Sequence, residues 1–299
     1  MRLIINIAFL LILNFSFSQT IKGNVLDSLT QKPLEFANVT LMTRNKGVYT
    51  NEKGAFLFEI KKHLYDTLKI SSIGYASKFI TLNKYKNQEV VNLNVLLNEK
   101  ITELEEVIIN SKKLEYKNRY RLGEKKNGIT AVSSLIGYET GVFIENPFNK
   151  EGKLKTIRIK LMKRDEVDFI ASLNIKFYRY DVINKKPGTE LYSKNVVVKP
   201  KNRNYTLKIN VEDFNIFLPE EGMCIGVEFI DPNNQSKKYD RIGPMYRFKF
   251  SNEEELTWSK YRGKYWKPGF VEFKRGNYNN NQNLKGNVMI GLDVLMPKD

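Results

Sequence analysis

Aspartate and glutamate side chains could catalyse hydrolysis in this chain without a histidine. A glycoside hydrolase uses two of them, one as acid and the other as base or nucleophile. The candidates are Glu139, Glu145, Asp165, Glu166, Asp168, Glu228 and Asp231. Their spacing selects no pair, and the alternation around Glu228 points its side chain to solvent or to an open sheet face. We expect surface charges and keep a carboxylate-based glycan hydrolase as the alternative function.

The low number of histidines and cysteines excludes most other kinds of catalytic site. His63 is the only histidine and Cys224 the only cysteine, so the chain offers no histidine pair for a metal and no HExxH motif. Cys224 lies in an apolar strand pattern typical of a buried thiol, and His63 follows two lysines in an expected turn. The sequence also has no Gly-x-Ser-x-Gly elbow, phosphate loop or dinucleotide fingerprint. We expect no enzyme, no cofactor and no metal.

One turn carries oxygen ligands that would suit calcium. It reads Asp231-Pro232-Asn233-Asn234 and is followed by Asp240. Carboxylate and amide oxygens are the ligands that Ca²⁺ prefers in proteins. The same residue types are also ordinary turn chemistry, and we expect a plain turn.

Aromatic and basic residues alternate near the C-terminal end. The rings belong to Trp258, Tyr261, Tyr265, Trp266, Phe270 and Phe273, and the interleaved cations to Lys260, Arg262, Lys264 and Lys267. Exposed rings would stack on sugar faces, with the cations suiting acidic glycans or lipid phosphates. Rings in a core would instead each bury about 150–250 Å², which we expect for Trp258 and Phe273. The predicted binding residues are Trp266, Tyr265, Tyr261, Lys264 and Lys267.

The N-terminus has the pattern of a secretory signal. Arg2 precedes an apolar run, Leu3–Leu13, and small residues end the segment at Ser16-Phe17-Ser18. The apolar run is too short for a membrane anchor, which needs roughly 20 residues. We therefore expect residues 1–18 to be a signal peptide cleaved after Ser18. The protein is then exported to the periplasm, the outer membrane or the cell surface.

The chain is strongly basic. Its 299 residues include 49 Lys and Arg against 33 Asp and Glu, a formal net charge of +16. Such a charge favours anionic partners, although charges spread along the chain also serve solubility. Because export separates the protein from nucleic acid, we expect no nucleic-acid partner. The expected partners are an envelope protein or an acidic glycan, with peripheral association with the membrane left open and the oligomeric state unpredicted.

Short runs of alternating apolar and polar residues recur throughout the chain and predict β-strands. We therefore expect strands to position the candidate residues described above. Residues 19–98 give seven such runs at roughly ten-residue spacing, the rhythm of a small antiparallel sandwich. Residues 131–299 continue with period-two alternation, which favours two packed sheets. The predicted strands there are Lys155–Met162, Ser172–Tyr180, Tyr205–Val211, Met223–Ile230, Met245–Phe250, Phe270–Lys274 and Val288–Leu295. Short helices are expected near Ser251–Lys260.

The segment between these two regions differs in composition. Residues 99–130 begin with an acidic stretch and continue with seven lysines and arginines between Lys112 and Lys126. Like charges repel one another, which favours an extended linker or a marginal helix. An arm that docks on an acidic surface is a further reading of the same charges.

The first β-region resembles the carboxypeptidase D regulatory-like domain, a transthyretin-like (prealbumin-like) sandwich. The resemblance rests on Gly23-x-Val25-x-Asp27, Pro33-Leu34-x-x-Ala37-Asn38-Val39, Thr50-Asn51-x-x-Gly54-x-Phe56 and Ile70-Ser71-x-Ile73-Gly74-Tyr75. It implies a domain without catalytic residues. Similar modules open the TonB-dependent receptors of the outer membrane, which implies an envelope location and a shared partner rather than the receptor function itself.

The second β-region resembles jelly-roll sandwiches through three short motifs. These are Phe177-Tyr178-x-x-Asp181, Lys186-Pro187-Gly188-x-Glu190-Leu191 and Leu218-Pro219-x-x-Gly222. The predicted fold class is all-β, with two β-sandwich domains, 19–98 and 131–299, joined by the charged linker 99–130. The first is a seven-stranded prealbumin-like sandwich and the second a larger jelly-roll-like one. The predicted function is an exported, non-enzymatic binding or assembly module of the cell envelope, as a glycan- or protein-binding accessory of an outer-membrane system.

Overall fold

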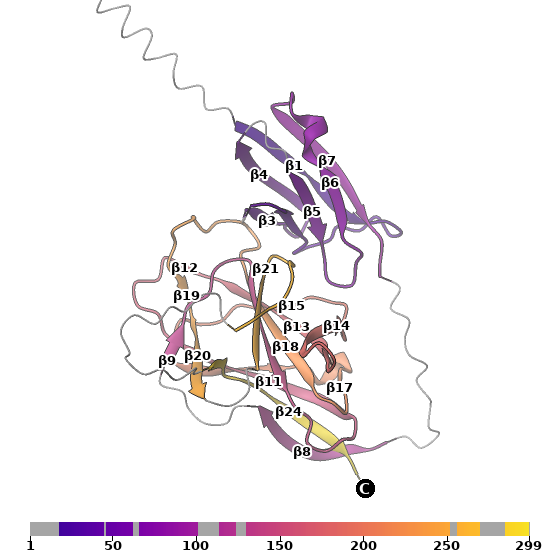
Figure 1. Cartoon of the computed structure of the whole chain (residues 1–299), viewed down its shortest axis with the longest axis vertical. Coiled ribbons are helices and arrows are strands. Elements are labelled where there is room, and N and C mark those ends of the chain that lie inside the picture. The colour runs from indigo at the N-terminus through magenta and orange to yellow at the C-terminus, as the bar shows by residue number, and fades with distance from the viewer. Residues whose placement is uncertain are drawn as a thin grey trace, which may run out of the picture. The chain divides into compact units, whose positions relative to one another are not determined.

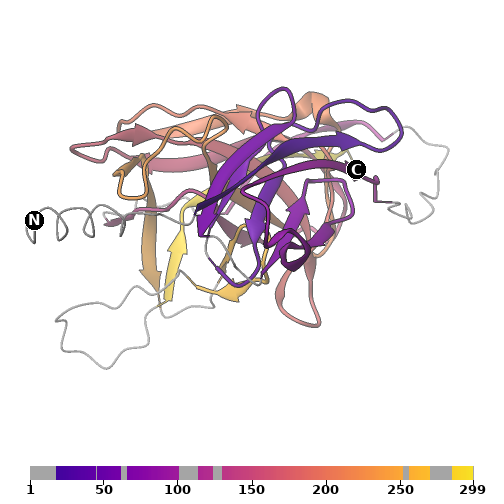
Figure 2. The same cartoon turned by 90° about the horizontal axis from the view of Figure 1, so that it is seen from above.

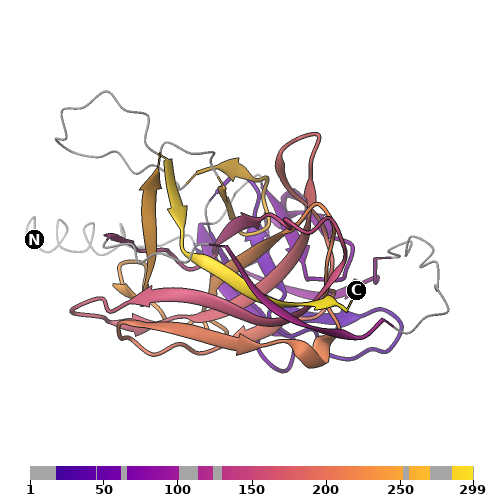
Figure 3. The same ribbon diagram turned by 90° about the horizontal axis from the view of Figure 1, so that it is seen from below.

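A computed structural model describes most of the chain as strands (Figure 1). It describes residues 18–44, 46–61, 66–100, 114–123, 130–251, 256–269 and 285–298. In these ranges the helical elements are two 3₁₀ turns, η1 (Leu82–Tyr85) and η2 (Glu212–Phe214). None of the described helical segments is long and apolar enough to pass through a lipid bilayer. Figure 2 and Figure 3 show the same strand-built architecture from above and below. The all-β prediction is confirmed.

The chain divides into two compact units. The N-terminal unit consists of residues 1–72 and 76–98, and the C-terminal unit of residues 73–75 and 99–299. The expected signal peptide, residues 1–18, lies outside the described residues except for Ser18, which begins the first strand. The signal therefore stays a prediction.

The N-terminal unit contains two sheets. The order in one is β4-β1-β7, where β1 pairs antiparallel with β4 and parallel with β7, and in the other β3-β2-β5-β6. The strands are β1 (Ser18–Asp27), β2 (Asn38–Leu41), β3 (Gly47–Tyr49), β4 (Ala55–Lys61), β5 (Thr67–Ser71), β6 (Lys78–Thr81) and β7 (Val90–Leu97). Strict alternation makes β7 buried at every second residue. Each strand can therefore give one face to the core and the other to solvent.

The motif residues of this unit have structural roles. A Cβ at Gly23 would lie 1.9 Å from the backbone oxygen of Leu93, so only glycine allows β1 and β7 to pair here. The Thr50 hydroxyl accepts a hydrogen bond from the Ala37 amide at 2.8 Å and donates one to the Leu34 oxygen at 2.6 Å. These contacts join the turn before β2 to the end of β3.

The C-terminal unit contains two large sheets and one small one. The seven-stranded sheet has the order β14-β13-β18-β10-β21-β22, with β15 paired to β13. Its strands are β10 (Tyr138–Ile144), β13 (Ser172–Asp181), β14 (Lys186–Glu190), β15 (Val196–Val198), β18 (Met223–Ile230), β21 (Thr257–Tyr261) and β22 (Lys267–Pro268). The small sheet pairs β12 (Phe169–Ile170) with β19 (Ile242–Gly243).

The eight-stranded sheet has the order β23-β20-β11-β24-β8. In addition, β16 and β17 pair with β11, and β9 pairs with β20. The strands are β8 (Tyr116–Gly123), β9 (Thr130–Val132), β11 (Gly152–Met162), β16 (Tyr205–Asn210), β17 (Phe217–Leu218), β20 (Met245–Ser251), β23 (Lys285–Val288) and β24 (Ile290–Pro297). Side chains from both large sheets form one apolar core, including Ile157, Ile159, Leu161, Ile175, Phe177, Ile225, Val227 and Leu292.

Two expectations about local structure are wrong. The segment expected as a linker contains β8, which pairs antiparallel with β24 from Tyr116 to Gly123. The arginines of β8 are tolerated in a strand because they form ion pairs with a carboxylate on β24, as described below. The helices expected near Ser251–Lys260 are absent from the described part of that segment, where β21 begins at Thr257. The predicted strand Phe270–Lys274 and His63 lie outside the described residues.

Candidate functional site

The outer face of the seven-stranded sheet carries a set of charged side chains. In β13, the apolar residues Ile175 and Phe177 belong to the core, so period-two alternation turns Lys176 and Tyr178 to the opposite face. The register then places further polar residues on this face. Glu139 of β10 lies opposite Glu228 of β18 and opposite Lys260 of β21. We call Glu139, Lys176, Tyr178, Glu228 and Lys260 the ion-pair network.

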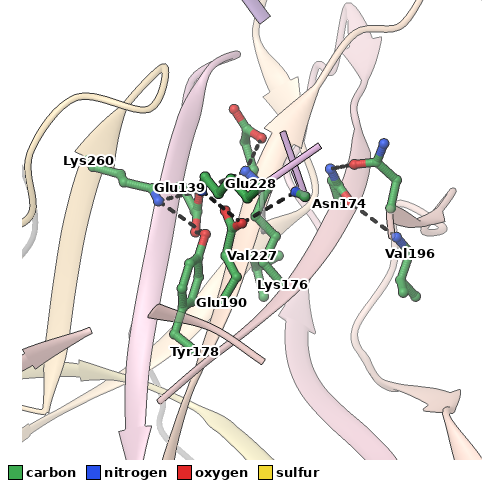
Figure 4. A network of polar contacts seen from close by, with 12 residues as sticks. Glu139, Asn174, Lys176, Tyr178, Glu190, Val196, Val227, Glu228 and Lys260 are labelled. Carbon is green, nitrogen blue, oxygen red and sulfur yellow. Dashed lines mark hydrogen bonds and ion pairs between the residues drawn. The ribbon is translucent and has the colours of Figure 1, made fainter. Parts of the chain in front are cut away.

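Lys176 is the centre of the ion-pair network (Figure 4). Its Nζ lies 2.9 Å from Oε2 of Glu139 and 2.9 Å from Oε2 of Glu228. Lys260 Nζ lies 3.3 Å from the same oxygen of Glu139. Both glutamates are buried. Two buried carboxylates are thus matched by two ammonium groups, which is the condition for keeping such charges away from water.

Tyr178 completes the hydrogen bonding of this cluster. Its hydroxyl donates to Oε1 of Glu139 at 2.7 Å and accepts from Nζ of Lys260 at 3.0 Å. Room for this arrangement comes from Gly226, since a Cβ there would lie 2.5 Å from Oε1 of Glu139. Glu139 therefore uses both oxygens and has two cations and one hydroxyl as partners.

These contacts shift the pKa values of the network's titratable groups. Burial alone would raise the pKa of Glu139, but Lys176, Lys260 and the Tyr178 hydroxyl outweigh it and hold the pKa below its ordinary value. Burial would lower the pKa of Lys176, but Glu139 and Glu228 raise it. Burial raises the pKa of Tyr178, reinforced by the charge of Glu139. At neutral pH the pair Glu139–Lys176 is fully charged and Tyr178 is protonated.

Aromatic rings pack beside the charges. Trp266 lies edge-on to Tyr178, with ring centroids 5.6 Å apart. Lys260 Nζ is 4.2 Å from the Trp266 centroid and 4.7 Å from that of Tyr178, in cation–π geometry. A Cβ at Gly141 would lie 3.0 Å from the indole. Trp266 therefore lies over the sheet as a half-buried ring that packs on its neighbours.

The remaining predicted binding residues are divided between two environments. Tyr265 is 71% exposed, and Lys267 Nζ lies 5.3 Å from its ring centroid. Tyr261 instead packs against Tyr138 with centroids 4.9 Å apart, and Lys264 Nζ lies 5.9 Å from the Tyr261 ring. Tyr265 and Lys267 are the exposed members of the predicted set.

Two rings expected in the core have different outcomes. Trp258 is buried, but it packs against Tyr180 on the outer face of the same sheet, with centroids 5.9 Å apart, and is not a member of the apolar core between the sheets. Phe273 lies outside the described residues, as does Phe270.

The candidate carboxylates fall into buried and exposed groups. The expectation of surface charges is wrong for Glu139, Glu228 and Asp231, which are buried. For the two glutamates the reason is that alternation gives the face of a strand but not what covers that face. The exposed ones form ion pairs, Asp165 with Lys163 and both Glu166 and Asp168 with Arg241, and Glu145 is exposed as well.

In the turn considered for calcium, two carboxylates accept hydrogen bonds from backbone amides of the same loop. Oδ2 of Asp231 accepts the Ser236 amide at 2.6 Å, and Oδ2 of Asp240 accepts the Lys237 amide at 2.5 Å. Within the described ranges no group of three or more His, Cys, Asp or Glu side chains is arranged to hold a metal ion. The single thiol, Cys224, is buried as expected, and burial raises its pKa.

Sequence reasoning missed Lys176 and Tyr178 as partners of Glu139. The available signal was a lysine and a tyrosine on the non-core face of a long, central apolar strand. Chemically, the ion-pair network can hold four strands together, because its members come from β10, β13, β18 and β21. Glu139 does not suit the role of a general acid, which must keep its proton at neutral pH, because its surroundings lower its pKa.

Comparison with known proteins concerns first the N-terminal unit. Residues 21–109 match the family model described as CarboxypepD_reg-like domain. This match confirms the resemblance that the motifs of the first β-region predict. None of the curated proteins matches the chain significantly.

Three solved structures with some similarity to the chain are remote. A DUF3823 family protein from Parabacteroides merdae is 11% identical, with a TM-score of 0.20, over 72% of this chain and 98% of that one. Another from Bacteroides uniformis is 11% identical, with a TM-score of 0.20, over 94% and 100%. BcpA, the major pilin subunit of Bacillus cereus, is 10% identical, with a TM-score of 0.21, over 84% and 66%. The chain carries a CarboxypepD_reg-like domain at residues 21–109.

Proposed function

We propose that this chain is exported and acts in the cell envelope as a non-enzymatic binding module that takes an acidic glycan. One observation carries the proposal. A cavity of about 600 Å³ lies in the N-terminal unit between β6, η1 and β7, and the described residues that line it include neither a carboxylate nor a histidine. The lining residues are Lys78, Phe79, Ile80, Thr81, Lys84, Tyr85, Asn92, Leu93 and Asn94. Its volume lies in the range of ligand sites, about 300–1,000 Å³.

The lining chemistry favours a hydroxyl-rich, acidic ligand. Asn92 and Asn94 offer amides that donate and accept hydrogen bonds. Phe79, which is 57% exposed, offers an apolar face, and the side chain of Lys84 lies 4.9 Å from the Tyr85 ring centroid. Lys78 and Lys84 add positive charge, which would attract carboxylate or sulfate groups of a glycan.

One wall of this cavity is fixed by a buried amide. Nε2 of Gln19, on β1, donates hydrogen bonds to the backbone oxygens of Tyr85 and Gln88, each at 2.7 Å. Gln19 is 2% exposed, so these bonds are shielded from water. The turn η1 therefore has a defined position, which lowers the entropic cost of binding.

The glycan-hydrolase alternative has one supporting feature and two opposing ones. Glu139 and Glu228 contact the same ammonium group, so two carboxylates lie near each other, as a glycosidase requires. A general acid, however, needs a raised pKa, and that of Glu139 is lowered. Both groups are also buried and bound to Lys176. These observations favour a structural ion pair.

Binding is tested with the mature chain and uronic-acid oligosaccharides by isothermal titration calorimetry. Tyr85→Ala and Lys84→Gln should each weaken binding about ten-fold, the loss expected for a stacking or charged contact. Lys53→Gln, which removes a charge from an exposed turn of the same unit, should leave the affinity unchanged. Equal affinity of neutral and acidic oligosaccharides, or no effect of Tyr85→Ala and Lys84→Gln, would overturn the glycan proposal, and a protein partner in the envelope would take its place.

The sequence also predicts a binding surface at Tyr261, Lys264, Tyr265, Trp266 and Lys267, and this remains a second proposal. Tyr265→Ala is its sharper test, because Trp266→Ala would also remove packing on the sheet. Glycan binding that survives both substitutions would remove this surface from consideration.

Export is tested separately by cell fractionation and N-terminal sequencing. Mature protein that begins at Gln19 is the expected result, and full-length protein in the cytoplasmic fraction would contradict it.

A further inference from the structure

Three arginines surround one buried carboxylate on the outer face of the eight-stranded sheet. Asp293 lies on β24. In the sheet, β24 lies between β8 and β11 (Figure 1). Arg158 of β11 binds it with two parallel contacts, Nε to Oδ1 at 2.9 Å and Nη2 to Oδ2 at 2.7 Å. Asp293 is 1% exposed. A bidentate pair of this kind fixes the guanidinium in position.

Two further arginines approach the same carboxylate from β8. Nη2 of Arg119 lies 2.7 Å from Oδ2 of Asp293, and Nε of Arg121 lies 3.4 Å from Oδ1. Both side chains are about half exposed, at 52% and 57%. One carboxylate offsets one of the three positive charges, so this cluster alone has an excess of two. Burial would raise the pKa of Asp293, but hydrogen bonds from Arg158 and Arg119 lower it to about 2.

A small cavity lies directly beside this cluster. Its volume is about 70 Å³, and its lining consists of Arg121, Leu122, Arg158, Lys160, Thr206, Met289 and Gly291. Lys160 and Thr206 lie opposite each other on β11 and β16, and Gly291 lies opposite Arg158. Since a water molecule takes about 30 Å³ in the liquid, the cavity suits a small ion and not a sugar ring.

Beside the cavity, β8 and β24 meet at two glycines, which have no side chains. Gly291 faces Gly123 across the β8–β24 pair. A Cβ at Gly291 would lie 2.7 Å from the backbone oxygen of Leu122, and one at Gly123 would lie 2.7 Å from that of Ile290. The two glycines let the strands approach and leave no side chain to fill the space between the cations.

We propose that this cavity binds a tetrahedral oxyanion, phosphate or sulfate, either free or as the headgroup of a lipid. Arg121 and Lys160 would supply charged donors from two sides, and Thr206 a hydroxyl, while Arg158 keeps its position through Asp293. Guanidinium groups match the oxygens of phosphate in pairs, and several donors converge on the same small volume. This site is in the C-terminal unit and is independent of the glycan cavity of the N-terminal unit.

The test titrates inorganic phosphate into the mature full chain by calorimetry, with sodium chloride adjusted to constant ionic strength. Saturable binding with a dissociation constant of about 1 mM or tighter is expected. Arg121→Gln and Lys160→Gln should each weaken it about ten-fold, because each removes a charged hydrogen bond. Lys153→Gln, which removes one charge from the same strand β11 outside the cavity, should change the affinity less than about two-fold. Far-UV circular dichroism checks that all variants are folded.

Vesicle sedimentation distinguishes the two sources of the anion. Binding to phosphatidylcholine vesicles that contain phosphatidate, lost in Arg121→Gln and competed by phosphate, would identify a lipid headgroup. Binding of free phosphate without vesicle binding would identify a soluble ion. Absence of saturable phosphate binding below about 10 mM, or equal affinity of wild type and the Arg121→Gln/Lys160→Gln double variant, would overturn the proposal.

Discussion

Replacing Lys176 by methionine should destabilise the C-terminal unit more than any comparable loss of a lysine. Lys176 is 14% exposed and lies 2.9 Å from each of two glutamates whose side chains are 1% and 6% exposed. Removing one partner of a buried ion pair costs about 3–5 kcal/mol, because the other charge is left without compensation. Lys260, 3.3 Å from Glu139, still compensates part of that charge. We therefore expect the lower end of the range, about 3 kcal/mol.

The loss of stability in Lys176→Met should become smaller as pH falls. In the wild type, the pKa of Glu139 is lowered by folding, so its stabilisation is present above the unfolded pKa of about 4.3 and is lost as pH falls below it. In Lys176→Met, burial without this cation should raise the pKa of Glu139 above about 4.3. The cost of burying the Glu139 charge is then present at neutral pH and decreases as the carboxylate binds a proton. The difference between variant and wild type should shrink from pH 7.5 to pH 5 by about 1 kcal/mol or more.

Urea unfolding followed by tryptophan fluorescence measures this difference. Both tryptophans of the chain, Trp258 and Trp266, lie in the C-terminal unit, so the signal reports that unit. Lys199→Met, at an exposed position, is the matched control and should lie within about 0.5 kcal/mol of wild type. A stabilising role of the buried ion pair is refuted if Lys176→Met costs no more stability than this control, or if its loss of stability grows as pH falls.

Three further predictions concern packing and reactivity. Gly226→Ala should cost about 1–3 kcal/mol in the same urea assay, because its Cβ would meet Oε1 of Glu139 at 2.5 Å; wild-type stability would contradict this. Gly23→Ala should abolish the hydrogen-exchange protection of β7 amides, since its Cβ would lie 1.9 Å from the Leu93 oxygen, while the tryptophan-detected transition stays unchanged; full protection would show that the strands can separate at little cost. Cys224, buried and with a raised pKa, should react with a thiol reagent such as dithionitrobenzoate only after unfolding, and rapid reaction of the native protein would contradict its burial.

Much of the fold could be predicted from local patterns. The alternation over Ser172–Tyr180 and over Met223–Ile230 predicts β13 and β18 within one residue, because the faces of a strand repeat every two residues. The glycine, threonine and asparagine motifs of the first region predict the N-terminal unit, since each of these residue types has a backbone role there. Gly23 is the clearest case, because no other residue fits at its position.

The ion-pair network and the arginine cluster could not be predicted, because both depend on pairings between distant segments. Glu139 and Lys176 become neighbours only through β18, which lies between their strands and comes later in the chain. Composition alone places Arg119 and Arg121 in a self-repelling linker. Their partner, Asp293, follows more than 170 residues later, and composition in a local window carries no information about it.

We propose that the buried carboxylates of the C-terminal unit hold strands together and do not transfer protons to a substrate. A ¹³C-carboxyl NMR titration of the mature protein, with the Glu139 resonance assigned by its loss in Glu139→Gln, tests this most directly. We predict that Glu139 titrates below the ordinary glutamate value of about 4.3. A Glu139 pKa raised toward about 6, as a general acid requires, would instead support a catalytic carboxyl group.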